Sequence, residues 1–221
     1  MLSVILPTRN EPLIQDLVTA IHRVLKGRQH EIVIIDKSDR LPTVRGARVY
    51  KQESNGLGHA VLEGVRKSKG QEVVVMDADF SHDPKDIPTL IQALKTKDFV
   101  IGSRYCKGGS TEDKERRYGI FPNSAISKIY CSLASTLLRL HVKDSMNGFA
   151  IARREVYDKV KLNPRGYKIH METAFKAKRM GFRVGEAPTT FHKRKAGKSN
   201  TGMSEAFRTL RFIFELRFGA R

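Results

Sequence analysis

Short apolar runs rich in valine and isoleucine alternate, over the first hundred residues, with stretches in which apolar positions recur every three or four residues. The runs predict buried strands, and the recurring positions predict helices. The predicted strands are Leu2–Leu6, Glu31–Ile35, Arg48–Lys51, Glu72–Met76 and Phe99–Ile101, and the predicted helices are Leu13–Leu25, Gly56–Lys67 and Ile87–Leu94. This alternation predicts a Rossmann-like α/β fold of three layers, in which helices cover both faces of a mostly parallel sheet.

The pattern changes after Arg104. Cys106–Arg117 is rich in glycine and charge and has no periodicity, so we predict a mobile loop there, and a second one at the basic segment His192–Gly202. The remaining predicted elements are helices at Ile126–Leu140, Met171–Arg179 and Ser204–Phe218 and strands at Phe149–Ala152 and Arg183–Glu186. We expect residues 1–203 to form one domain and residues 204–221 to form an amphipathic C-terminal helix.

Polar residues follow four of the predicted strands. They are Pro7-Thr8-Arg9-Asn10-Glu11, Asp36-Lys37-Ser38-Asp39, Asp77-Ala78-Asp79 and Gly102-Ser103-Arg104. Ligands of an open parallel sheet bind beyond the C-terminal ends of its strands. We therefore expect the four segments to converge on one site.

Asp77 and Asp79 are the strongest candidates for chemistry. They flank one small residue directly after a valine-rich strand, so both carboxylates reach the same sheet edge. Hard oxygen ligands of this kind suit Mg²⁺ or Mn²⁺, which often shares its coordination sphere with substrate phosphates. The alternative is structural: Asp79 or Ser81 caps the next turn, and Asp83 before Pro84 opens a helix.

Each of the other candidates also has a structural explanation. Asp36 is placed to bind a ribose hydroxyl or a base edge, or to form an ordinary turn. The glycines of Gly56–Gly58 precede a helix, where they would accept a phosphate or allow close packing. Arg104 would face the crevice or lie on the surface. We expect His170 and Glu172, near a helix start, to be capping or surface residues.

The charge of the chain narrows the choice of partner. The 221 residues include 41 basic and 23 acidic ones, which gives a formal net charge of +18 and predicts an anionic partner. The absence of tryptophan and of an RNP-like strand argues against nucleic acid. Two cysteines, Cys106 and Cys131, exclude a disulfide framework, and no apolar run approaches the ~18 residues of a membrane span. We therefore expect a cytoplasmic domain.

The motifs, taken together, resemble a known family. They are Val4-Ile-Leu-Pro-Thr-Arg-Asn-Glu11, Val33-Ile-Ile-Asp-Lys-Ser-Asp39, Gly56-Leu-Gly-His-Ala60, Val75-Met-Asp-Ala-Asp-Phe-Ser-His-Asp-Pro84, Gly102-Ser-Arg-Tyr105, Asp144-Ser-Met-Asn-Gly-Phe149 and Gly185-Glu-Ala-Pro188. In this order they are similar to the family 2 glycosyltransferases, and to their dolichyl-phosphate mannosyltransferase branch. The resemblance implies a GT-A fold, a nucleotide-sugar donor (most often GDP-mannose), Mg²⁺ or Mn²⁺, and a polyprenyl phosphate acceptor.

The resemblance also assigns roles to single residues. Those that would bind metal and diphosphate are Asp77, Ala78, Asp79 and Ser81, with Asp77, Asp79 and Ser81 as the metal ligands. Those that would hold the nucleoside are Pro7, Arg9, Glu11, Ile35, Asp36 and Lys37. Those that would contact the donor or acceptor phosphate are Arg104, Arg194 and Lys198. Catalysis would depend on Asp77, Asp79 and Arg104.

Three positions depart from the family pattern. Arg9 stands where the family usually has tyrosine, Lys37 where it has a second aspartate, and Asn200 where it has lysine. Lys195 or Lys198 would replace the charge that is missing at Asn200. The departures leave the metal site and the type of reaction unchanged, and they put the identity of the donor in question.

The acceptor decides whether a general base is needed. An acceptor phosphate is already ionised at neutral pH, so an inverting transfer to it needs only cations that stabilise the leaving diphosphate. The alternative is a family 2 enzyme that glycosylates a hydroxyl of a glycan or a small molecule. That reaction requires a base, and Glu172 and Asp144 are the candidates.

A lipid acceptor would also explain the positive charge, because basic residues attract a protein to an anionic membrane. One stripe of the last predicted helix is apolar and has arginines beside it: Phe207, Leu210, Phe214 and Phe218, with Arg211 and Arg217. We expect a peripheral protein at the cytoplasmic face of a membrane, and the sequence leaves open whether a membrane-spanning extension or a membrane partner subunit accompanies it. The alternative is that this stripe packs on the domain.

Overall fold

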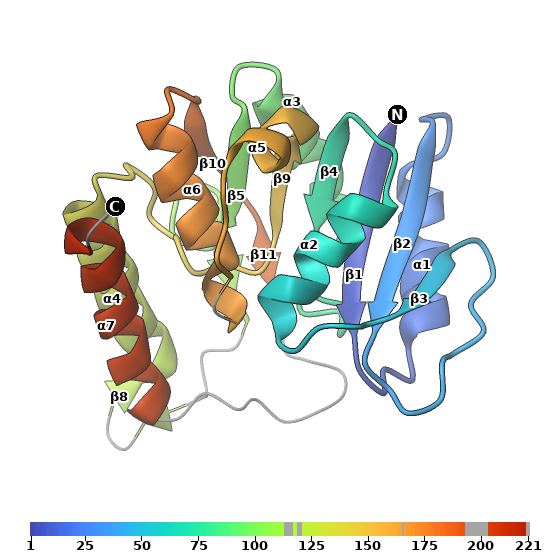
Figure 1. The fold of residues 1–221 in the computed structure, drawn as a ribbon, viewed down its shortest axis with the longest axis horizontal. Coiled ribbons are helices and arrows are strands. Elements are labelled where there is room, and N and C mark those ends of the chain that lie inside the picture. Colours follow the sequence, from blue (N-terminus) through green and yellow to red (C-terminus); the bar gives the residue numbers. More distant parts are fainter. Residues whose placement is uncertain (113–116, 119–120, 165, 193–202, 220–221) are drawn as a thin grey trace.

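Seven strands form one sheet between two layers of helices in the computed structural model, which describes residues 1–112, 117–118, 121–164, 166–192 and 203–219 (Figure 1). The strands lie in the order β10-β5-β9-β4-β1-β2-β3. Their bounds are β1 Leu2–Thr8, β2 His30–Asp36, β3 Arg48–Lys51, β4 Glu72–Val75, β5 Phe99–Ser103, β9 Ala150–Arg153 and β10 Val184–Pro188. All neighbours are parallel except β9, which is antiparallel to β4 and β5, so the predicted mostly parallel α/β sheet is confirmed.

The two faces of the sheet are buried by different helices. Helices α1 (Ile14–Val24) and α3 (Ile87–Leu94) cover one face, and α2 (Leu57–Lys67), α5 (Arg154–Lys159) and α6 (Ile169–Arg179) cover the other. Burial on both faces explains why the strands are continuously apolar rather than alternating. The sequence did not predict α5, which is only six residues long and therefore shows little periodicity.

β1 continues two residues beyond the predicted end at Leu6, although Pro7 lacks an N–H. Ile5 accepts a hydrogen bond from Met76 on the β4 side, and Pro7 faces the same side. The pairing of β4 with β1 ends at Val75, which pairs with Ile5. No strand partner therefore requires a donor at Pro7, and the strand extends to Thr8 beside β2.

The aperiodic segment after Arg104 contains a short strand, which corrects the prediction of a loop throughout Cys106–Arg117. Strand β6 (Ser110–Thr111) pairs in parallel with β11 (Thr190–Phe191). Two residues are too few to show a periodicity, so this pairing was not predictable from the pattern. The remaining short elements are β7 Arg117–Tyr118, β8 Phe121–Pro122, η1 Pro84–Asp86 and η2 Gly166–Lys168.

The C-terminal helix α7 (Met203–Phe218) packs beside α4 (Asn123–Leu138) at one end of the molecule (Figure 1). Phe212 and Ile213 are 5% and 0% exposed and belong to the main core. Phe207, Phe214 and Phe218 are 70%, 51% and 66% exposed. The three aromatic residues of the predicted stripe therefore do not pack on the domain, whereas its fourth member, Leu210, is half-buried. A second apolar face of α7 packs on the domain instead.

The described part of the chain contains no helix that is both long enough and apolar enough to cross a membrane.

Close packing of α2 on the sheet depends on Gly64. A Cβ at this position would lie 2.3 Å from Cγ2 of Ile5 in β1. We expect Gly64→Ala to lower the free energy of unfolding by about 1–3 kcal/mol, because overpacking outweighs the gain in helix propensity. Urea unfolding measures it, with the exposed Arg66→Ala on the same helix as control. A Gly64→Ala protein as stable as the wild type would contradict this account of the packing.

Candidate active site

The C-terminal ends of neighbouring strands bring the predicted polar segments to one edge of the sheet. Thr8 pairs with Asp36 across β1 and β2, and Ile5 pairs with Val75, two residues before Asp77. β5 runs in the same direction as β4, because each pairs antiparallel with β9 between them. The four segments therefore lie at the same edge of the sheet, and their convergence on one binding site stays a prediction.

The carboxylate of Asp77 lies against the backbone of Gly148. A Cβ at position 148 would be 2.7 Å from Oδ2 of Asp77, so the close approach depends on glycine. Nε2 of His82 lies 3.6 Å from the same oxygen. The Asp77 side chain is still 29% exposed. The neighbours thus fix this carboxylate from behind and leave it open toward solvent.

Asp79 shapes the loop that follows β4. Its Oδ1 accepts a hydrogen bond from the backbone N–H of Ser81 (3.0 Å), and Phe80 between them has a φ of 59°. Asp83 caps η1 by accepting from the N–H of Lys85 (2.9 Å). Asp79 and Asp83 thus have the turn-forming and capping roles that the structural explanation gave them. Asp79 is nevertheless partly exposed and lies at the same sheet edge as Asp77.

Asp77 and Asp79 suit a divalent cation. Among the described residues, no group of three or more His, Cys, Asp or Glu side chains forms a ready metal site. A cation held here would take two carboxylates and complete its coordination with water or diphosphate oxygens, as Mg²⁺ commonly does. Ser81, the third predicted ligand, is completely buried, and its hydroxyl has no hydrogen-bond partner among the described residues. The two aspartates are thus the accessible part of the predicted set.

Two buried histidines stand behind Asp77. The ring of His82, which is 1% exposed, lies 5.1 Å from the ring of Phe149 and 5.4 Å from that of Phe191. Burial lowers the pKa of His170 to about 4, although Asp77 favours the charged form, so His170 is neutral at physiological pH. The expectation that His170 lies at the surface or caps a helix is wrong. A single histidine near the start of a helix does not show in the sequence that its side chain is buried.

Asp36 holds the turns after β1 and β2 together. It is 1% exposed, and its oxygens accept hydrogen bonds from Thr8 Oγ1 (2.5 Å) and from the N–H of Ser38 (2.8 Å). Ser38 Oγ in turn accepts from the N–H of Asn10 (2.7 Å). Lys37 turns away, and its Nζ donates to the carbonyl of residue 54 (3.0 Å). Asp36 thus has the turn-forming role, and a contact with ribose stays a prediction.

The remaining nucleoside candidates differ in accessibility. Arg9 is exposed, and Glu11 accepts a hydrogen bond from the N–H of Leu13 (3.1 Å). Pro7 and Ile35 are buried in the sheet, so a nucleoside would meet their backbone only. Two of the three residues predicted to contact phosphates, Arg194 and Lys198, lie outside the described residues. So do Lys195 and Asn200.

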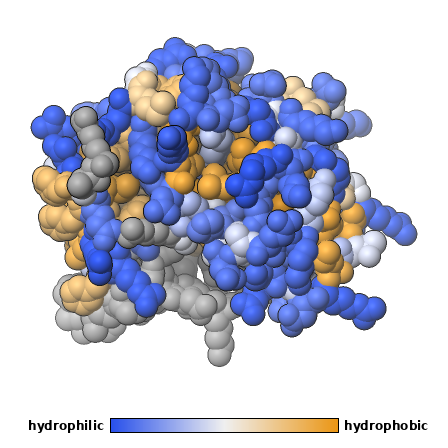
Figure 2. Space-filling view, viewed as in Figure 1, coloured by the Kyte–Doolittle hydropathy of each residue, from blue (hydrophilic) through white to orange (hydrophobic). Residues whose placement is uncertain are grey.

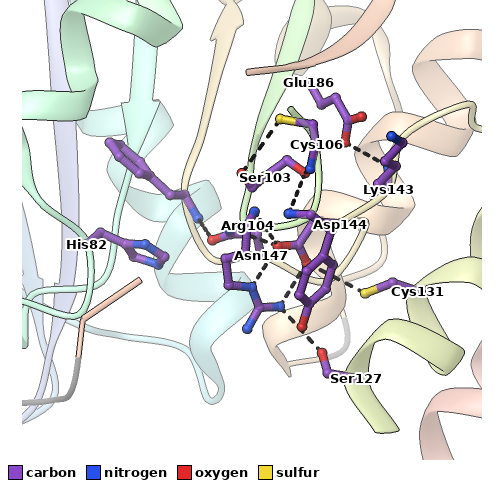
Figure 3. Close-up of polar contacts among 12 residues, drawn as sticks. His82, Ser103, Arg104, Cys106, Ser127, Cys131, Lys143, Asp144, Asn147 and Glu186 are labelled. Carbon is purple, nitrogen blue, oxygen red and sulfur yellow. Dashed lines mark hydrogen bonds and ion pairs between the residues drawn. The ribbon is translucent and has the colours of Figure 1, made fainter. Parts of the chain in front are cut away.

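Arg104 forms a buried ion pair with Asp144 (Figure 3). Its Nε and Nη2 donate to Oδ2 (2.7 Å) and Oδ1 (2.8 Å) of the carboxylate, and its backbone N–H donates to Oδ2 (3.0 Å). Asp144 is 0% exposed and the Arg104 side chain 16%. Burial disfavours the charged guanidinium, but the hydrogen bonds to Asp144 prevail and raise its pKa above the ordinary value. The sequence predicted that Arg104 contacts a phosphate, and it did not predict the ion pair with Asp144.

The two candidate bases are both engaged by cations. Asp144 is paired with Arg104 as described. Glu172 is 1% exposed, and its Oε1 accepts hydrogen bonds from Lys176 Nζ (2.6 Å) and from the N–H of Asn163 (2.8 Å). Glu172 is therefore buried rather than a surface residue, and it holds the segment before α6.

Gly58, in the first turn of α2, serves close packing, as the structural explanation held, whereas Gly56 adopts a left-handed backbone conformation that favours glycine. A Cβ on Gly58 would lie 2.5 Å from the Cβ of Pro164, and Gly56 has a φ of 94°.

The sequence profile of glycosyl transferase family 2 matches residues 3–161, which includes β1 through β9 and the whole Asp77 loop. The chain belongs to this family. Two of its curated relatives are the dolichol-phosphate mannosyltransferases of Pyrococcus furiosus (37% identical; 97% of this chain and 63% of the relative covered) and Mycosarcoma maydis (28%; 98% and 80%). A third is the undecaprenyl-phosphate mannosyltransferase of Micrococcus luteus (31%; 68% and 63%). The chain thus spans somewhat less than two thirds of the Pyrococcus and Micrococcus relatives.

Solved structures of glucosyl-3-phosphoglycerate synthase from Mycobacterium tuberculosis share the fold of this family 2 glycosyltransferase. One, in complex with phosphoglyceric acid, has a TM-score of 0.72 at 18% identity and covers 100% of this chain and 81% of its own. Another, in complex with Mn²⁺, UDP-glucose and phosphoglyceric acid, has a TM-score of 0.71 at 20% identity (98% and 78%). The implied GT-A fold is therefore confirmed.

The ion pair gives a test of the site's architecture. We expect Asp144→Asn to lower the free energy of unfolding by about 3–5 kcal/mol, because it leaves a buried guanidinium without its countercharge. Glu155→Gln, which removes the exposed Glu155–Lys159 pair, should cost less than about 0.5 kcal/mol. Denaturant unfolding of both variants measures the difference. Equal, small losses would show that the Arg104 charge is solvated without Asp144.

Proposed function

We propose that this chain carries the catalytic site of an inverting, metal-dependent polyprenyl-phosphate mannosyltransferase, with GDP-mannose as donor. The observation that carries the proposal is the pair Asp77 and Asp79 at the sheet edge, with Asp77 held against Gly148. Relatives named as mannosyltransferases of dolichol phosphate and undecaprenyl phosphate support the choice of substrates. A solved structure of the same fold in complex with Mn²⁺ and UDP-glucose supports a metal and a nucleotide-sugar donor.

Asp77 and Asp79 would hold Mg²⁺ or Mn²⁺, which supplies positive charge to the leaving diphosphate. The protein's part is to hold both carboxylates in a fixed orientation at the sheet edge. Gly148 and His82 restrain the carboxylate of Asp77, and the turn to Ser81 restrains that of Asp79. This preorganisation avoids rearrangement as charge develops in the transition state.

Neither of the two candidate bases is available for catalysis, which is consistent with an acceptor that needs no base, namely a phosphate. Asp144 and Glu172 are both buried in ion pairs, so neither is placed to take a proton from an acceptor hydroxyl. His170, with its pKa of about 4, is neutral but enclosed at 2% exposure. A phosphate oxygen needs no deprotonation and attacks the anomeric carbon directly, which breaks the bond to the diphosphate and inverts the configuration. This favours a phosphate acceptor over the hydroxyl-acceptor alternative.

The nucleoside would lie over the joined turns after β1 and β2. Arg9, exposed at this position, would stack on or hydrogen-bond the base, and the backbone at Ile35 and the Asp36–Lys37 turn would border the ribose. The arginine is planar and carries five donors, so it would replace the tyrosine of the family pattern by a different contact. We assign Arg194 and Lys198 to the phosphates as charged groups, and Arg104 as a hydrogen-bond donor, because Asp144 already balances its charge.

The lipid acceptor requires contact with a membrane, and the exposed surface of α4 and α7 offers it. Two apolar residues of α4, Ile129 (67%) and Leu133 (38%), are exposed together with Phe207, Phe214 and Phe218 of α7. We call these five residues the α4–α7 apolar surface; Figure 2 shows apolar side chains at this end of the molecule. Exposed apolar surface beside basic residues is typical of interfacial binding. We propose a peripheral location at the cytoplasmic face of an anionic membrane, with or without a membrane partner subunit.

Asp79→Asn tests the reaction. We expect it to reduce metal-dependent transfer of mannose from GDP-mannose to polyprenyl phosphate by at least about 100-fold, the cost of losing one preorganised charged group. Transfer of radiolabelled sugar into an organic-extractable lipid measures it, over a panel of GDP- and UDP-sugars. Asp83→Asn in the same loop keeps its cap and should retain activity. Tight metal-dependent donor binding without lipid product from any donor would favour the hydroxyl-acceptor alternative.

The apolar surface gives a separate prediction. Phe214→Ser together with Phe218→Ser should weaken binding to vesicles of phosphatidylcholine and phosphatidylglycerol at least tenfold, because each aromatic side chain contributes about 1.5–3 kcal/mol when fully buried. Vesicle flotation measures the bound fraction. Met180→Ser, which changes an exposed apolar residue (53%) of the α6 end, is the matched control. An equal loss with both proteins would mean that the surface has no specific part in binding.

A further inference from the structure

A cavity of about 260 Å³ lies beside α4, and the proposed reaction does not use it. We call it the α4 pocket. Its polar lining consists of two lysines, three hydroxyls and one phenol: Lys128, Lys143, Ser132, Ser135, Thr136 and Tyr105. Among the residues that the structure describes, no acidic one lines it. Lysine ammonium groups and hydroxyls donate hydrogen bonds, so this lining suits an anion with several acceptor oxygens.

The helix explains how the pocket is built. Lys128, Ser132, Ser135 and Thr136 follow one another at steps of four, three and one residues, so they lie along one face of α4. The exposed Ile129 and Leu133 form the adjoining ridge. The α4 pocket therefore opens next to the α4–α7 apolar surface.

Arg104 is close by but is already neutralised. Its guanidinium carbon lies 4.8 Å from the centre of the Tyr105 ring, and Lys128 Nζ lies 5.3 Å from the same centre. Because Asp144 pairs with Arg104, the charge that a ligand in the pocket meets comes from Lys128 and Lys143. The other carboxylate drawn in Figure 3, that of Glu186, accepts a hydrogen bond from the backbone N–H of Lys143 (2.7 Å), and Glu186 is not among the residues that line the pocket.

We propose that the α4 pocket binds a phosphate group, with Lys128 and Lys143 supplying the charge and Ser132, Ser135 and Thr136 the hydrogen bonds. This site is distinct from the one at Asp77 and Asp79, which takes its phosphate through a metal. Two sources have this chemistry: the headgroup of an anionic phospholipid, and free phosphate or a small phosphate ester. The lipid source rests on the proposed membrane contact, whereas phosphate binding itself does not.

The test measures binding of the full chain without donor or metal, so it is independent of sugar transfer. One arm titrates inorganic phosphate by calorimetry; the other measures flotation with vesicles that contain phosphatidylglycerol, against vesicles of phosphatidylcholine alone. Lys128→Ala with Lys143→Ala should weaken binding at least tenfold, since each basic residue near an anionic surface contributes about 1 kcal/mol. Ser132→Ala with Thr136→Ala should weaken it about threefold or more at unchanged charge. Lys26→Ala with Lys95→Ala, which removes two exposed lysines elsewhere, is the control.

The outcomes separate the two sources. A loss in both arms, or in the vesicle arm alone, supports a site for lipid phosphate, and a loss with inorganic phosphate alone supports a soluble ligand. The proposal is overturned if the wild type binds neither ligand, if the control loses as much as the pocket variant, or if the hydroxyl variant binds like the wild type. Unchanged urea midpoints establish that the variants are folded.

Discussion

The buried ion pair of Arg104 and Asp144 is the interaction on which the geometry of the site depends. It joins the end of β5 to the segment that leads into β9, with three hydrogen bonds to one carboxylate. In the same segment, Oδ1 of Asn147 accepts a hydrogen bond from the N–H of Phe149 (3.1 Å), which leaves Gly148 between two anchored residues. A buried pair contributes little net stability, but it selects one arrangement of the chain. Here that arrangement places a glycine against Asp77.

The sequence predicted the strands and helices whose apolar residues follow a regular spacing, and the polar residues that come directly after those strands. Valine-rich runs, helical spacing and the Asp77-Ala-Asp79 loop sufficed for the parallel part of the sheet and for the edge where the site lies. The antiparallel insertion of β9 and the β6–β11 pairing depend on contacts between distant segments, which a local pattern does not contain. For the same reason the burial of His82 and His170 behind Asp77, and the pairing of Asp144 with Arg104, were not predicted. Only the fold brings them together.

Helix α7 illustrates how one sequence pattern can hide another. The stripe of Phe207, Phe214 and Phe218 was visible from the spacing, and it lies exposed. The opposite face, with Phe212 and Ile213, fixes the helix to the core and went unnoticed beside it. Because Phe212 and Ile213 already bind α7 to the core, the aromatic face remains exposed, and we propose that it contacts the membrane. The α4–α7 apolar surface and the α4 pocket lie at the same end of the molecule, where we propose lipid contact and phosphate binding.

The central claim is that the Asp144–Phe149 segment positions Asp77 for metal and donor. Its most direct test is calorimetric titration of GDP in the presence and absence of Mn²⁺, with the wild type and Gly148→Ala. The added Cβ would meet Asp77 Oδ2 at 2.7 Å and displace the carboxylate. The account predicts at least a tenfold loss of the Mn²⁺-dependent affinity, with little change in metal-independent binding. Equal Mn²⁺-dependent affinity in a folded Gly148→Ala protein would contradict it.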